Sequence, residues 1–127
     1  NLMAGHQFVG RKDRTHIRMY RARGYDCRIE DAKGTRTWKA YDRGARTAVT
    51  AKDGRALQLM LLRAPMPDRN GRGMQDRLRL LVQKPNEDAP ISEVEAAPRA
   101  ASIEARYEGV SASCASVDTL PPMHVAH

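Results

Sequence analysis

Two leucine-rich segments, residues 56–63 and 77–84, constrain the fold of this chain more than any other feature. Their large aliphatic side chains recur at every second position, a period that places them on one face of a β-strand. Met60 and Leu62 make the first segment apolar on its other face as well, which is typical of a strand in the interior of a sheet. We expect the two segments to pair antiparallel and to form the centre of the core. The alternating aliphatic residues are Leu57, Leu59, Leu61, Leu78, Leu80 and Val82.

Shorter alternating stretches predict further strands over residues 15–22, 27–31, 35–42 and 48–51. Between 48–51 and 56–62, Asp53-Gly54 suits a two-residue type I′ turn, because both of its central positions need a positive φ. The two leucine-rich strands are separated by residues 64–76, which are rich in Pro and Gly and are predicted to be a long loop.

The C-terminal third is less clear. Residues 85–98 are rich in Pro and acidic residues and are predicted to be a connecting segment. Over 97–108, alternation favours a strand that joins Val110–Val117 in a hairpin through Glu108-Gly109. Helix propensity instead favours a short helix that Pro98 opens and Gly109 ends. We prefer the hairpin.

The expected architecture is therefore mainly β. The 127 residues are long enough for one domain with a real core but too short for two ordinary ones. We predict a small antiparallel β-sandwich or barrel spanning residues 1–127, with one short C-terminal helix (an α+β fold) as the alternative. Residues 1–5 and 120–127 are expected to be flexible ends.

Charge is distributed unevenly along the chain. The total of +7 comprises +12 over residues 1–84 and −5 over residues 85–127. Arg outnumbers Lys by 17 to 5, and guanidinium groups suit bidentate contacts to phosphate or carboxylate. A GC-rich coding sequence would give the same ratio. Because the acidic residues are spaced, we expect the C-terminal third to pack on the basic body.

The most basic stretch, residues 10–28, combines cations with an aromatic ring and predicts a β-sheet face that binds a polyanion such as nucleic acid. An acidic protein surface is an equally suitable partner, and a solvated strand face explains the same residues without any partner. Arginines of the 64–76 loop would add to the contact. The predicted binding residues are Arg11, Arg14, Arg18, Tyr20, Arg21, Arg23, Arg69 and Arg72.

The two cysteines, Cys27 and Cys114, lie 87 residues apart in predicted strands. A disulfide between them would indicate an oxidising compartment and an exported envelope or host-interaction protein. Unpaired, each would be a small buried apolar side chain. The sequence leaves both alternatives open.

No signature of a catalytic, nucleotide-binding or metal site occurs in the sequence, and we expect neither cofactor nor metal. The sequence also contains no apolar run long enough to predict a membrane span. His16, which lies between Arg14 and Arg18, is the weak catalytic candidate for a small nuclease-type toxin. A non-enzymatic binding module is the interpretation we prefer.

Overall fold

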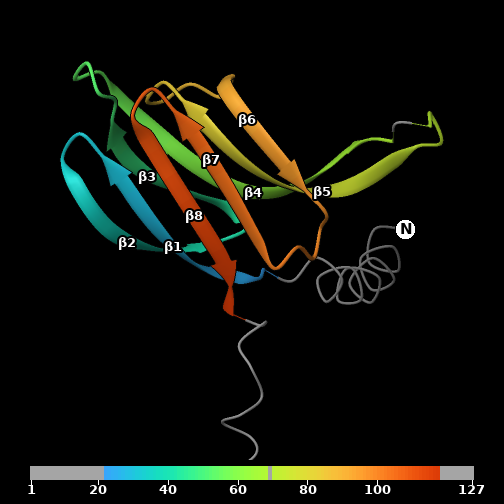
Figure 1. Cartoon of the computed structure of the whole chain (residues 1–127). Helices are drawn as coiled ribbons and strands as arrows, with labels where there is room; N and C mark the ends of the chain where they lie inside the picture. Colours follow the sequence, from blue (N-terminus) through green and yellow to red (C-terminus); the bar gives the residue numbers. More distant parts are fainter. Residues whose placement is uncertain (1–21, 69, 118–127) are drawn as a thin grey trace, which may run out of the picture.

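The structure is a computed structural model that describes residues 22–68 and 70–117. These residues form two four-stranded antiparallel sheets packed together as a small β-sandwich, which confirms the predicted fold class (Figure 1). The strands are β1 (Gly24–Asp31), β2 (Gly34–Tyr41), β3 (Arg43–Thr50), β4 (Ala56–Pro67), β5 (Met74–Gln83), β6 (Pro90–Ala96), β7 (Ser102–Tyr107) and β8 (Val110–Ser116). One sheet has the order β2-β1-β8-β7 and the other the order β3-β4-β5-β6.

The core lies between the sheets and centres on the two leucine-rich strands. β4 and β5 pair antiparallel, with Leu59 opposite Val82 and Leu61 opposite Leu80, as predicted. Burying each leucine contributes roughly 2 kcal/mol to the free energy of unfolding. The fully or nearly fully buried core side chains from the facing sheet are Tyr25, Cys27, Ile29, Ala40, Ile103, Ala105, Val110, Ala112 and Cys114.

Two of the predicted irregular segments contain strands, so these predictions were wrong in part. Most of the 64–76 loop continues the ladder, because Ala64 to Pro67 pair with Met74 to Arg77 and leave only 68–73 as a turn. Within the predicted 85–98 connection, residues 90–96 form β6. Here Val94 faces the core while Glu93 and Glu95 face outward, so an alternating strand is present in an acid-rich sequence.

The hairpin expected over residues 97–117 is confirmed as β7 paired with β8, and the helical alternative is wrong. Glu108 and Gly109 both have positive φ, 49° and 84°, as a type I′ turn requires. The type I′ turn predicted at Asp53-Gly54 does not form, since only Gly54 has positive φ there and Ala51 pairs with Arg55 around a three-residue loop.

A buried carboxylate closes one side of the sandwich. The Asp31 side chain is fully buried and accepts two hydrogen bonds from the Arg36 guanidinium, each 3.1 Å, and one from the Thr50 N–H at 2.8 Å. Arg36 also donates to the Ala48 carbonyl oxygen at 2.7 Å, which ties β2 to β3 in the other sheet. The Arg36 guanidinium, followed by the backbone N–H groups of Thr50 and Lys33, outweighs burial and lowers the pKa of Asp31 from 3.8 to about 2.

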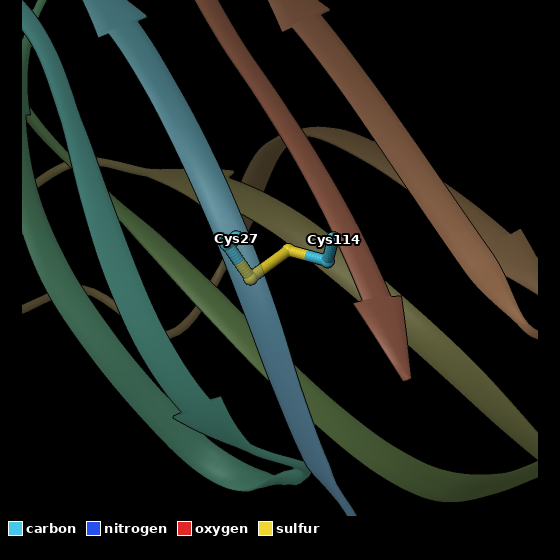
Figure 2. The surroundings of a disulfide bond; sticks show 2 residues. All are labelled: Cys27 and Cys114. Carbon is cyan, nitrogen blue, oxygen red and sulfur yellow. A yellow bond between two sulfur atoms is a disulfide. The ribbon is translucent and has the colours of Figure 1, made fainter. Parts of the chain in front are cut away.

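The two cysteines form a disulfide inside the sandwich. Cys27 of β1 stands opposite Cys114 of β8, with 4.0 Å between their Cα atoms (Figure 2). Both side chains face the core, with residue exposures of 3% and 0%. The bond therefore links neighbouring strands that are 87 residues apart in the chain.

Several sequence predictions lie outside the described residues. They are all but the last residue of the strand predicted over 15–22, the flexible ends at 1–5 and 120–127, and six of the predicted binding residues together with His16.

Removing the disulfide should weaken the fold markedly. We expect Cys27→Ala/Cys114→Ala to lower the free energy of unfolding by about 2–5 kcal/mol, because the bond closes a long loop in the unfolded chain. Urea denaturation of the oxidised parent and the variant measures this difference. An unchanged midpoint and slope would show that the bond contributes nothing to stability.

The Asp31 cluster predicts an acid-dependent loss of stability. A carboxyl whose pKa is lower in the folded state stabilises the fold fully above pH 3.8, and this contribution disappears as the pH falls to about 2. We expect Asp31→Asn to cost about 2 kcal/mol at neutral pH, and the difference from the parent to shrink near pH 2. Urea denaturation of both proteins at the two pH values tests this, and a difference independent of pH would contradict it.

Candidate binding surface at the β4–β5 arm

The β4–β5 hairpin extends beyond the rest of its sheet. β3 stops pairing with β4 at Leu62, and β6 stops pairing with β5 at Leu78. Beyond these points a two-stranded ribbon, residues 64–67 and 74–77 with the turn 68–73, projects from the sandwich (Figure 1). We call residues 64–77 the arm.

The tip of the arm is a tight turn that glycine makes possible. The Asp68 N–H donates to the Gly73 carbonyl oxygen at 2.7 Å, and the Gly71 N–H donates to the Asp68 carbonyl oxygen at 3.0 Å. Gly71 and Gly73 have φ of 70° and 115°, conformations that side chains with a Cβ rarely adopt. Arg72, between them, is therefore held at the exposed end of the arm.

A buried group of charges joins the base of the arm to the start of β1. Asp42, between β2 and β3, accepts a hydrogen bond from the Arg23 N–H at 2.9 Å. Its other carboxylate oxygen lies 3.7 Å from Nη1 of Arg63, and Nε of Arg63 lies 3.8 Å from a carboxylate oxygen of Asp76 in the arm. The side chains of Asp42 and Arg63 are 1% and 11% exposed, so this ion pair is shielded from water.

Backbone contacts reinforce the same junction. The Asp42 N–H donates to the Arg23 carbonyl oxygen at 3.1 Å, and the Arg63 N–H donates to the Asp42 carbonyl oxygen at 2.7 Å. Tyr25 is buried nearby, and burial, aided by the charge of Asp42, raises the pKa of its phenol against the opposing effect of Arg23. Arg23, which directly precedes β1, is thus fixed at the end of the sandwich from which the arm projects.

Two of the eight predicted binding residues are described. Arg23 lies at the junction, where its guanidinium also donates to the Arg99 carbonyl oxygen at 3.5 Å. Arg72 is exposed at the tip of the arm. The other predicted binding residues, Arg11, Arg14, Arg18, Tyr20, Arg21 and Arg69, lie outside the described residues, as does His16.

Sequence reasoning missed Asp42, Arg63 and Asp76. A signal for Arg63 was present, because it continues the inward-facing series Leu57, Leu59 and Leu61 at the next alternate position. A cation at a core-facing position needs a buried partner. The sequence alone does not show that this partner comes from the corner between β2 and β3.

The outer faces of the two sheets are close to electrically balanced. On the outer face of the β2-β1-β8-β7 sheet, three cations accompany three carboxylates. These residues are Arg28, Lys39, Arg106, Asp26, Glu30 and Glu104. On the other sheet, Arg79 pairs with Glu93 at 2.6 Å and Arg77 with Glu95 at 3.5 Å. The C-terminal third thus supplies β6 carboxylates that neutralise part of the basic body.

The described residues contain no group of three His, Cys, Asp or Glu side chains that could hold a metal ion. Nor does this part of the chain include a helix with the length and apolar character needed to cross a membrane. No protein-family model matches the chain, and no curated protein or solved structure shows significant similarity to it.

The buried junction should be sensitive to loss of its carboxylate. We expect Asp42→Ala to lower the free energy of unfolding by about 3–5 kcal/mol, because it removes a buried carboxylate that pairs with Arg63 and accepts a hydrogen bond from the Arg23 N–H. Asp26→Ala, which removes an exposed carboxylate 3.8 Å from Lys39, is the matched control and should cost less than about 1 kcal/mol. Urea denaturation compares the two, and equal losses would contradict this assignment.

Proposed function

We propose that this protein is a non-enzymatic binding module that contacts a polyanion such as nucleic acid. The contact surface combines the arm with the Arg-rich segment that leads into β1. The observation that carries the proposal is the junction of Arg23, Asp42, Arg63 and Asp76, which fixes the end of that segment at the base of the arm.

The distribution of charge supports a contact through the arm and the segment before β1 rather than through the outer face of a sheet. The described residues contain 16 Lys and Arg against 13 Asp and Glu, a net charge of only +3. Residues 1–21 add a further +4, from five cations and one carboxylate, Arg69 adds one more and Asp118 removes one, which gives the total of +7. More than half of the excess positive charge of the whole chain therefore lies in residues 1–21, which precede β1, whereas the arm has a net charge of +1.

The form of the arm supports the same proposal. A two-stranded antiparallel ribbon is narrow enough to enter the major groove of a nucleic acid duplex. The turn places Arg72 ahead of the ribbon, where neither sheet can screen it, and Arg69 precedes it by three positions. Guanidinium groups at such a tip suit bidentate contacts to phosphate oxygens.

Salt dependence of binding tests the proposal. We expect the affinity for a short DNA or RNA duplex to fall steeply as salt rises, because each neutralised phosphate releases a counterion. Arg72→Ala should weaken binding and reduce the slope of log affinity against log salt by about 1. Fluorescence anisotropy over a salt series measures both quantities.

The matched control removes a cation from a balanced sheet face. Arg28→Ala, on the exposed face of β1, should leave the affinity and the slope almost unchanged. Binding that is absent, independent of salt, or equally sensitive to Arg28→Ala and Arg72→Ala would contradict the proposal.

A second candidate function is that of an exported envelope or host-interaction protein. The Cys27–Cys114 pair favours it, because structural disulfides form and persist in oxidising compartments. Protein from its natural source, treated with a thiol-alkylating reagent before and after reduction, gives the test by intact mass. Two alkylated thiols without reduction would count against export.

A further inference from the structure

The two free edges of the arm differ in their capacity to form hydrogen bonds. The Arg63 N–H points away from β5, since it donates to Asp42, whereas the Asp68 N–H points across the ribbon to Gly73. Because N–H directions alternate along a strand, the odd-numbered residues of β4 in the arm face outward. Pro65 and Pro67 occupy these positions, so the outer edge of β4 has no donor there.

The outer edge of β5 is open by the same geometry. Met74 and Asp76 stand opposite Pro67 and Pro65, so their backbone N–H and C=O groups also point away from the ribbon. β6 pairs with the outward-facing backbone groups of β5 only as far as Leu78, which stands opposite Ala96. Within the described residues, no strand lies against the edge at Met74 and Asp76. An edge of this kind is a template for pairing with another strand.

The side chains along this edge are self-complementary. Met74 is 65% exposed, the most exposed large hydrophobic side chain among the described residues. Asp76 lies two positions after it and Arg72 two positions before it, so an antiparallel copy would bring opposite charges together.

We infer that the open edge of β5 binds the same edge of a second copy of this chain. The two strands run antiparallel with Met74 on the two-fold axis, so that each Met74 N–H donates to the Met74 carbonyl oxygen of the other copy. The exposed Met74 side chains then cover one another, and Asp76 faces Arg72 of the second copy. A register with Asp76 on the axis is excluded, because it would place two carboxylates directly opposite each other.

The contact is a weak one. An edge of a few residues buries less surface than the roughly 1,600 Å² typical of stable complexes. The dimer therefore forms in the micromolar range or above, and it joins the two arms into one four-stranded sheet. The inference shares Arg72 with the proposed polyanion contact but does not depend on polyanion binding, so the dimer is measured without nucleic acid.

Cysteine cross-linking tests the register in the absence of nucleic acid. The described chain has no free cysteine, so Met74→Cys introduces a single reactive thiol at the proposed axis. Residues paired across an antiparallel ladder have Cα atoms close enough for a disulfide. We expect at least about tenfold more cross-linked dimer than for Ser113→Cys, on the exposed face of β8, or for Gln75→Cys, which is off the axis. Non-reducing electrophoresis measures the fractions.

Sedimentation velocity on protein without added cysteine tests the pairing itself. The parent should rise from monomer towards dimer mass with concentration, whereas Met74→Pro should stay monomeric, since proline is tolerated at the first position of a strand but removes the outward donor. A parent that stays monomeric up to millimolar concentration overturns the inference. So does a dimer that Met74→Pro leaves intact, or cross-linking at Gln75→Cys that exceeds that at Met74→Cys.

Discussion

The pairing of β4 with β5 is the interaction on which the rest of the structure depends. These are the two longest strands, and their inner faces supply most of the large aliphatic side chains of the core. Both occupy the interior of their sheet, so each neighbouring strand is positioned by one of them. The same ladder runs past the sandwich to form the arm, so the register that places the leucines inside also sets which residues are displayed outside.

Charged residues, chiefly Arg63, lie at the boundary between the core and the arm. Leu57, Leu59 and Leu61 face the other sheet, and Arg63 follows at the point where the sandwich ends. Its ion pairs with Asp42 and Asp76 join a corner of the sandwich to the base of the arm. The net stability gained from a buried ion pair of this kind is small, because desolvation offsets much of the attraction between its charges. Here the arrangement fixes where the chain enters β1 relative to the arm.

The sequence predicts those parts of the sandwich that depend on local patterns, such as alternation within one strand or a two-residue turn. Alternation identifies the inward-facing side of β1, β4, β5 and β8, and Glu108-Gly109 identifies a turn that needs two positive φ values. Prediction from the sequence fails where strand pairing overrides the local amino-acid composition. Prolines at 65 and 67 suggest a loop, yet their missing N–H groups would point to solvent, so the ladder to β5 loses no hydrogen bond. The acid-rich β6 is misread for a similar reason, because its carboxylates pair with Arg77 and Arg79 on the neighbouring strand.

The proposed binding surface is less predictable than the fold, since the junction at its base depends on residues brought together from four places in the chain. Arginine content marks residues 11–23 and the arm as rich in cations, but only the Asp42 junction shows that Arg23 lies at the base of the arm. The disulfide adds a constraint on the ligand rather than on the surface. If Cys27 and Cys114 are oxidised in the natural source, the second proposal, that of an exported protein, is favoured. The polyanion would then be an anionic polymer of the envelope, recognised by the same guanidinium chemistry and with the same dependence on salt.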